Sequence, residues 1–219
     1  MGGSRKNIEQ TDGHHPETTR SSFARLVTNE NEVDALVTLF ARIAVEEGWQ
    51  PGGELTAYRH RSAYFCLHDS GLLVGGLQVV LPDEAGTLPC QKVWPEQEFT
   101  GKVGVAHVAM LALAQPARGK QDEVNGPSPF LFWLLCVEMW RWCRENNIGE
   151  LWLEATPRTL RCYQRLGWPL MVCGPLREHW GEPCYLTVLD IDAVTKSVAA
   201  KAARSQAYRH ILGLAHAAD

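Results

Sequence analysis

The chain has 219 residues, of which 45% are hydrophobic and 21% charged, and its formal net charge is -4. This length and composition are typical of one globular domain with tails. No block of lysine or arginine occurs along the sequence. We therefore expect neither nucleic acid nor an anionic membrane surface as a partner.

The seven cysteines are scattered through apolar segments and form no C-x-x-C pair. An odd number without metal-ligand spacing predicts reduced, mostly buried thiols and no metal site. The first twenty residues are polar and lack the apolar core of a secretory signal, and the longest apolar run, Pro129 to Val137, is shorter than the roughly 20 residues of a membrane-spanning helix. A cytoplasmic protein with a disordered tail over residues 1–22 is the expectation.

The first regular segment is an amphipathic helix predicted over Glu30 to Glu47, with Thr28 and Asn29 as candidate caps and Gly48 as the stop. Two strands follow, Thr56 to His68 and Leu72 to Leu81. The intervening Asp-Ser-Gly turn predicts an antiparallel hairpin.

A strand buried on both faces is predicted over Val103 to Leu113, after a proline-containing loop from Pro82 to Thr100. It is followed by a polar turn and then by an almost uniformly apolar helix, Phe130 to Asn146. Such a helix must lie deep against a sheet.

The C-terminal third contains a second strand-helix unit, with a strand over Leu151 to Ala155 and a helix that begins at Pro157. Final strands are expected over Leu170 to Cys173 and Tyr185 to Leu189, and a single alanine-rich helix over Ala193 to Leu214. The order predicts an α/β fold with a mixed central sheet flanked by helices. Its boundaries are expected at residues 23–192, with the C-terminal helix and tail over 193–219.

An anion site is expected at the turn after the buried strand, where Arg118, Gly119 and Lys120 precede a helix. Backbone N–H groups near Gly119 and the two cationic side chains could bind a pyrophosphate there. The alternative is an ordinary solvated surface turn.

The Arg118-Gly119-Lys120 turn, followed by the run Arg161-Cys162-Tyr163-Gln164-Arg165-Leu166-Gly167-Trp168, resembles the GNAT superfamily of acyltransferases. Within it, Trp94-Pro95-Glu96 and the Glu46-Glu47-Gly48-Trp49 segment resemble the acyl-homoserine lactone (autoinducer) synthases and N-acyl amino acid synthases. The resemblance covers roughly residues 25 to 190.

This resemblance implies a donor site for acyl-CoA, or for the phosphopantetheine arm of an acyl carrier protein, in a V-shaped gap beside the strand Val103 to Leu113. The donor-binding residues it implies are Met110, Leu111, Leu113, Arg118, Gly119 and Lys120.

The resemblance also implies that Tyr163 protonates the departing thiolate and that His107 or Glu154 removes a proton from the attacking amine. The chemistry agrees, because an amine is mostly protonated at neutral pH and a base that titrates near pH 7 generates the nucleophile. For each residue a structural alternative remains: His107 hydrogen-bonded in the core, Glu154 paired with an arginine, and Tyr163 as a core aromatic.

The sequence departs from the autoinducer synthases in the central strand, where His107-Val108-Ala109-Met110 stands in place of a stretch with Glu and Arg. Gln78 stands where the family has an arginine. Because the charges that would hold S-adenosylmethionine are missing, a different amine acceptor is the simpler account.

An acceptor carboxylate could be held by Arg59 and Arg61, which are expected on one strand, although an exposed polar face is the alternative. Trp49 and Gln78 are expected at the acceptor site through the resemblance. Trp133 and the other aromatic residues of its helix either line a tunnel for a long acyl chain or fill the core.

The expected function is N-acyl transfer from acyl-CoA or an acyl carrier protein to a small, amino-acid-like amine. The alternatives are an acyl-homoserine lactone synthase that uses S-adenosylmethionine and an inactive binding module of the same fold. The C-terminal helix either packs on the domain or makes a homodimer contact.

Overall fold

The computed structural model describes residues 22–99, 104–114 and 129–216. Its strands are β1 (Ser22–Leu26), β2 (Ser62–Asp69), β3 (Leu72–Val80), β4 (Val105–Leu113), β5 (Glu150–Ala155), β6 (Met171–Val172), β7 (Arg177–His179) and β8 (Glu182–Asp190). Its helices are α1 (Glu30–Glu47), α2 (Glu54–Ala57), α3 (Pro129–Glu145), α4 (Pro157–Leu166), α5 (Ile191–Ala202) and α6 (Gln206–His216), with 3-10 turns η1 (Arg59–Arg61) and η2 (Pro89–Lys92). None of the described helices is long and apolar enough to cross a bilayer.

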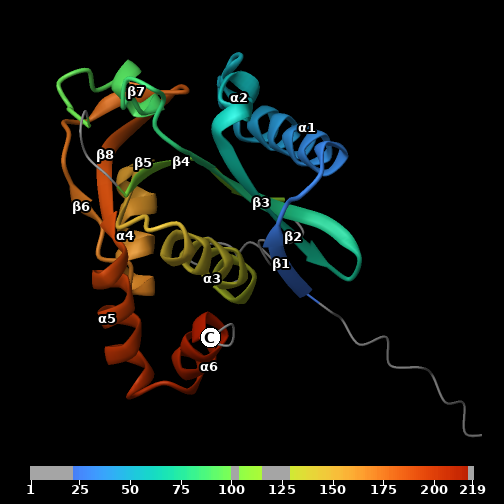
Figure 1. Cartoon of the computed structure of the whole chain (residues 1–219), viewed down its shortest axis with the longest axis vertical. Helices are drawn as coiled ribbons and strands as arrows, with labels where there is room; N and C mark the ends of the chain where they lie inside the picture. The colour runs from blue at the N-terminus through green and yellow to red at the C-terminus, as the bar shows by residue number, and fades with distance from the viewer. Residues whose placement is uncertain (1–21, 100–103, 115–128, 217–219) are drawn as a thin grey trace, which may run out of the picture.

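The strands form one sheet in the order β1-β2-β3-β4-β5-β8-β6, and β7 pairs with β8 outside this path (Figure 1). The neighbours β4 and β5 are parallel, whereas the other described pairs are antiparallel. Parallel neighbours need a long crossover, and α3 lies within it. The predicted mixed α/β sheet is confirmed.

The two central strands separate part-way along β4. Pairing of β4 with β5 covers Val105 to Val108, whereas pairing of β4 with β3 continues to Leu113. A bulge accompanies the separation, because Val79 pairs with Val108 and Gln78 pairs with Met110, which leaves Ala109 as the extra residue. Beyond Val108, β4 and β5 therefore diverge.

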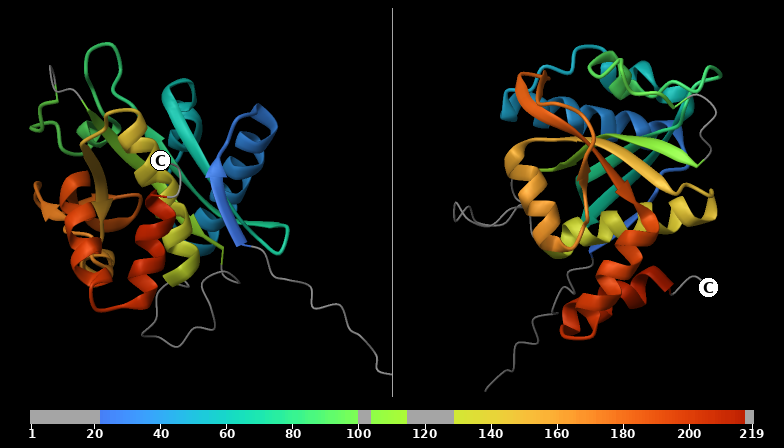
Figure 2. Two further views of the ribbon diagram at one scale, coloured as in Figure 1. Left: turned by 60° about the horizontal axis from the view of Figure 1, so that its bottom comes forward. Right: turned by 90° about the vertical axis from the view of Figure 1, so that its left-hand side faces the viewer.

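Helices cover both faces of this sheet, with α3, α5 and α6 on one face and α1 on the other (Figures 1 and 2). Ala106 and Val108 pack with α3, whereas Val105 packs with η2 on the opposite face. Because the bulge shifts the alternation by one residue, Met110 faces α1, on the same side as Val105. We call these two sides the α3 face and the α1 face.

The ends of α1 and α4 agree with the sequence signals. The Asn29 side chain caps α1 by accepting a hydrogen bond from the Glu32 N–H, and Gly48 ends it in the left-handed region at φ 75°. Pro157 occupies the first turn of α4, and Gly167 ends that helix at φ 100°. These predicted boundaries are confirmed.

The packing of α1 on the sheet requires a glycine in β3. A Cβ atom on Gly76 would clash with the Leu36 side chain and would lie 2.8 Å from the Phe65 carbonyl oxygen. Leu36 is fully buried here, so α1 approaches the sheet backbone closely. This contact fixes α1 over β3.

Three predictions about the elements are wrong, and one strand, β1, was not predicted. Arg59 and Arg61 lie in η1 rather than on a strand, because the Arg61 N–H donates to the Tyr58 carbonyl and closes a turn before β2 begins. Pairing with β2 makes a strand of the short segment β1, and β7 lies in what was predicted as a loop. The C-terminal segment forms two helices instead of one, because the chain turns after Ala202 so that α6 packs against α3.

Candidate active site

A buried histidine and a buried glutamate meet across the two central strands. The His107 Nε2 atom lies 3.0 Å and 2.8 Å from the two carboxylate oxygens of Glu154. Strand alternation places His107 on the side of Val105, and Glu154 on the side of Trp152, so both point to the α1 face. Their side chains are 3% and 9% exposed. The structure therefore forms a pre-organised pair next to the point where β4 and β5 diverge.

The electrostatics of this pair favour an ionised carboxylate. Burial raises the pKa of Glu154, but the charge of His107 and its hydrogen bond lower that pKa by more, so the net shift is downward. An ionised carboxylate accepts hydrogen bonds only, which assigns the proton to Nε2 of His107. In the neutral form of the imidazole, Nδ1 is then the atom with the free lone pair.

The Nδ1 atom of His107 is itself buried and has no hydrogen-bond partner among the described residues. A buried polar atom without a partner costs free energy, on the order of 1–3 kcal/mol, unless a ligand or a reaction uses it. A histidine with one nitrogen held by a carboxylate and the other nitrogen free is the arrangement of a general base.

Two buried cysteines lie on the same face as this pair. The thiols of Cys90 and Cys184 belong to the cluster around Trp152, and burial raises both pKa values, with the negative charge of Glu154 adding to the effect. The pKa of Cys184 is about 12. Both thiols are therefore protonated at neutral pH and are poor nucleophiles. Most of the cysteines that the structure describes are buried, as predicted.

Tyr163 lies on α4 and belongs to the opposite side of the sheet. Its ring stacks on Phe132 of α3, with centroids 5.4 Å apart, and lies 5.7 Å from the ring of Trp168. Burial raises its pKa further above the ordinary value, so the hydroxyl is protonated at neutral pH. The structure thus brings His107 and Glu154 together and places Tyr163 on the α3 face.

No protein-family model and no curated protein matches the chain, but solved structures do. FeeM, an N-acyl amino acid synthase from uncultured soil microbes, superposes with a TM-score of 0.65 at 18% identity, over 82% of this chain and 96% of that chain. The AHL synthase LasI gives 0.61 at 14% identity, over 78% and 91%. BjaI, a CoA-dependent acyl-homoserine lactone synthase, gives 0.62 at 13% identity, over 84% and 92%.

This chain has the fold of a GNAT-type acyltransferase. The predicted resemblance to the synthase branch is confirmed at the level of the fold, since an N-acyl amino acid synthase and acyl-homoserine lactone synthases both superpose along most of their length.

The predicted donor-binding residues of this GNAT-type fold are only partly described. Met110, Leu111 and Leu113 lie in the part of β4 beyond its last pairing with β5 at Val108, and on their other side they pair with β3. Arg118, Gly119 and Lys120 lie outside the described residues.

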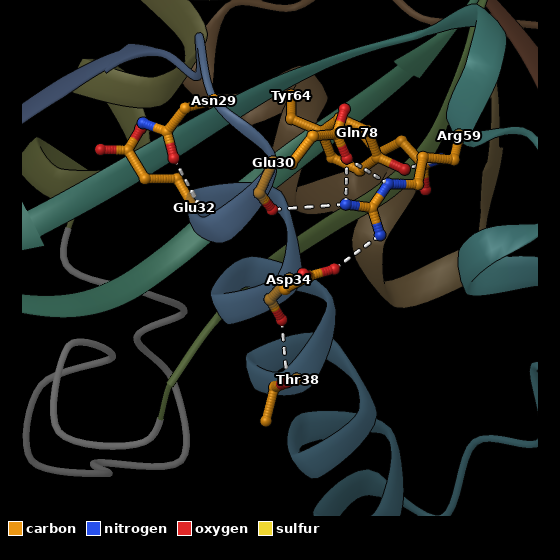
Figure 3. Close-up of polar contacts among 8 residues, drawn as sticks. All are labelled: Asn29, Glu30, Glu32, Asp34, Thr38, Arg59, Tyr64 and Gln78. Carbon is orange, nitrogen blue, oxygen red and sulfur yellow. Dashed lines mark hydrogen bonds and ion pairs between the residues drawn. The ribbon is translucent and has the colours of Figure 1, made fainter.

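Both arginines that were predicted to bind a carboxylate form ion pairs or hydrogen bonds with other residues of the protein. Arg59 forms ion pairs with Glu30 and Asp34 of α1, the latter at 2.6 Å (Figure 3). Arg61 donates two hydrogen bonds of 2.8 Å to the carbonyl oxygens of Leu81 and Thr87. These contacts anchor η1 to α1 and to the end of β3.

Gln78 is 1% exposed, and its amide donates hydrogen bonds to the Ser62 and Tyr64 hydroxyls at 2.9 Å and 3.1 Å. Figure 3 shows Gln78 and Tyr64 beside the Arg59 network. A cavity of about 360 Å³ adjoins this region and is lined by residues that include Ser62, Tyr64 and Trp142. A second cavity, of about 830 Å³, lies between the end of α3 and the start of α5, away from Glu154.

The two predicted tryptophans have different surroundings. Trp133 is 4% exposed and packs with the rings of Trp168 and Tyr208, at 6.0 Å and 5.8 Å between centroids, so it contributes to the core beneath α6. Trp49 is half-buried at the end of α1 and packs against the cluster on the α1 face.

The sequence analysis assigned no site role to Trp94, which follows η2, or to Gly174, which precedes β7. Trp94 is fully buried, and its indole N–H donates to the Pro175 carbonyl at 2.9 Å. A Cβ on Gly174 would lie 2.6 Å from the Trp94 ring, so glycine is required for this contact. The signal that could have located the β7–β8 hairpin is the Trp180-Gly181 pair between β-forming residues.

Among the described residues, no cluster suits a metal ion.

Proposed function

We propose that this protein is an N-acyltransferase that moves an acyl group from a thioester to the amine of a small acceptor. The observation that carries the proposal is the buried His107–Glu154 pair, whose Nδ1 atom has no partner among the described residues, located where β4 and β5 diverge in a GNAT-type fold. A base of this kind accelerates proton transfer by about 10²–10⁴-fold.

In the proposed reaction the amine nitrogen attacks the thioester carbonyl carbon, and the carbon–sulfur bond breaks. His107 Nδ1 takes the proton that the nitrogen loses, while Glu154 holds the imidazole in the required tautomer and stabilises the imidazolium. The departing thiolate takes a proton from the Tyr163 hydroxyl, which recovers one from solvent. A thioester lying between the diverging strands would be open to both faces, with His107 on one and Tyr163 on the other.

The proposed donor is acyl-CoA or an acyl carrier protein. BjaI was solved with isopentyl-CoA, and an aminoglycoside acetyltransferase of the same fold was solved with coenzyme A. The part of β4 beyond Val108 supports this proposal, because its edge towards β5 has no pairing there. Main-chain groups of Met110 and Leu111 would contact the donor.

The proposed acceptor is an amino acid or a similar small amine, in keeping with the N-acyl amino acid synthase among the matched structures. The second candidate is an acyl-homoserine lactone synthase, as in BjaI, which was solved with S-adenosylmethionine. The sequence favours the first, because β4 carries His107 and Met110 where that family has Glu and Arg.

The test is release of free thiol from acetyl-, octanoyl- and palmitoyl-CoA in the presence of an amino acid panel or S-adenosylmethionine. Amine-dependent thiol release with amino acids supports the proposal. Release only with S-adenosylmethionine supports the lactone synthase. Thermal stabilisation by a thioester without any thiol release would instead indicate a binding module without catalysis.

A further inference from the structure

The proposed base is enclosed on the α1 face between two apolar clusters. Along β4, Val105 belongs to the cluster that includes Trp94, whereas Met110 belongs to the cluster that includes α1. His107 lies between them on the same face, and its side chain is 3% exposed. Because its Nδ1 atom is buried as well, an amine reaches this atom only when part of the cover moves.

The tip of the β7–β8 hairpin bridges the two clusters. The ring of His179, the last residue of β7, stacks on Trp180 with centroids 4.9 Å apart and lies 6.4 Å from the ring of Trp94. Trp94 belongs to the first cluster, and Trp180 packs against the second. The hairpin tip therefore connects the clusters that lie on either side of His107.

The hairpin begins beside the other member of the proposed catalytic pair. Glu154 pairs in register with Leu186 of β8, and the Leu186 carbonyl accepts a hydrogen bond of 3.2 Å from the Gly174 N–H. Arg177, the first residue of β7, forms an ion pair of 2.9 Å with Glu96. These contacts fix the start of the hairpin next to β5.

The tip of the hairpin is attached to the opposite side of the α1 face. The Trp180 carbonyl accepts a hydrogen bond of 3.1 Å from the Gln50 N–H, and the Trp180 indole donates one of 3.2 Å to Glu54. Glu54 also pairs with Lys92 of η2 at 3.2 Å, and the Lys92 side chain is 56% exposed. A segment attached by so few polar contacts opens more readily than the central sheet.

The residue that makes both tip contacts is unusual for its position. Trp180 and Gly181 have left-handed backbone conformations, at φ 53° and 87°. Two-residue hairpin turns of this kind favour Asn-Gly. The backbone therefore does not account for a tryptophan here, whereas the contacts of its side chain with Glu54 and with the α1 cluster do.

Resting on the function proposed above, we propose that the β7–β8 hairpin is a lid over the acyl-transfer site and that the Trp180–Glu54 hydrogen bond is its latch. In the closed state, the hairpin tip and the two clusters exclude water from His107. In the open state, the tip leaves α2 while the start of the hairpin stays attached beside Glu154, and a small amine can reach Nδ1. Closure after the acceptor has entered keeps water away from the thioester.

The first test measures access to His107 rather than turnover. The full-length protein is treated with diethyl pyrocarbonate, which acylates unprotonated imidazole nitrogens, and modification of each histidine is followed by peptide mass spectrometry. In the wild type, His107 should react at least about tenfold more slowly than the exposed His210 of α6. Trp180→Phe keeps an aromatic ring but loses the N–H that binds Glu54, so His107 should react about tenfold faster than in the wild type while His210 is unchanged.

The matched control is Glu178→Gln, which changes an exposed residue of the same hairpin and should leave the labelling of His107 at the wild-type rate. Equal rates for His107 in the wild type and Trp180→Phe would overturn the proposal, as would a wild-type His107 that reacts as fast as His210. Failure of the proposed function would instead appear as absent thiol release, with the predicted labelling pattern retained.

The second test uses the wild type alone and therefore decides the question if Trp180→Phe does not fold. Hydrogen exchange of the Gln50 N–H, which donates to the Trp180 carbonyl, reports on opening of the tip. A lid opens locally, so this amide should exchange faster than the amides of β5 and with no dependence on low urea concentrations. Exchange of Gln50 only through global unfolding, with the urea dependence of β5, would overturn the proposal.

Discussion

Two charged networks lie on the α1 face. They differ in the exposure of their side chains and in whether a polar atom remains without a hydrogen-bond partner. The ion pairs of Arg59 with Glu30 and Asp34 involve carboxylates that are 79% and 64% exposed, and they join η1 to α1. The His107–Glu154 pair is almost fully buried and leaves the Nδ1 atom without a partner among the described residues.

The difference indicates where chemistry takes place. Exposed ion pairs have low desolvation costs and small effects on stability, so the Arg59 network needs no further explanation. A buried pair has a high desolvation cost, and a protein in which apolar residues replace such a pair is often equally stable or more stable. A buried pair with one free nitrogen is therefore the stronger candidate for a catalytic role.

The largest expected effect comes from His107→Gln. The glutamine amide can still donate to Glu154, so the fold should persist, but the base is lost and kcat/KM for acyl transfer should fall by about 10²–10⁴-fold. The matched control is His60→Gln, which changes an exposed histidine of η1 and should keep the wild-type rate. A wild-type rate in His107→Gln would remove the assigned role.

A smaller effect is expected from Tyr163→Phe. Solvent can protonate the leaving thiolate in part, so kcat should fall by about tenfold, short of the full general-acid range. Tyr208→Phe is the control: it loses a hydrogen bond of 2.8 Å to the Leu166 carbonyl, which should cost about 1 kcal/mol of stability and no activity. Equal rates in wild type and Tyr163→Phe would leave Tyr163 as a core aromatic.

The buried pair should also make stability depend on pH. The pKa of Glu154 is lower in the folded chain than its ordinary value of 4.5, so its contribution is present above about pH 4.5 and is lost as the pH falls through the folded value. The urea midpoint of the wild type should therefore decrease on acidification below pH 4.5. Glu154→Gln should show a shallower decrease, and identical pH dependences would mean that the pair is not ionised in the fold.

The smallest effect is expected at the exposed network. Arg59→Lys keeps the charge but loses the forked guanidinium that contacts two carboxylates. The melting temperature should therefore decrease slightly, and added salt should make the difference from wild type smaller. The KM for the amine acceptor should not change. A large increase in that KM would instead show that Arg59 binds the acceptor, as the sequence first suggested.

Much of the fold could be predicted from the sequence because its signals are local. The caps of α1 and α4 and the apolar run of β4 are properties of short segments, and the predicted helices and strand were found there. The segments β1 and β7 are short and gain their conformation from pairing with β2 and β8, which no local pattern contains. The split of the C-terminal helix likewise depends on packing of α6 against α3.

The site was predicted in part for the same reason. His107 and Glu154 could be proposed as neighbours because their strands were expected to be adjacent. The separation of Tyr163 onto the other face, and the position of the β7–β8 hairpin on the α1 face, follow from the three-dimensional arrangement alone. The engagement of Arg59 and Arg61 by their own chain could not be read from residue types.

The central claim is that the His107 imidazole is the base of acyl transfer, and chemical rescue tests it most directly. His107→Ala leaves an imidazole-sized space beside Glu154, and amine-dependent thiol release from octanoyl-CoA is measured with increasing free imidazole. The account predicts a rate at least about 10²-fold below wild type that rises and saturates with imidazole. A wild-type rate in His107→Ala without imidazole would contradict it.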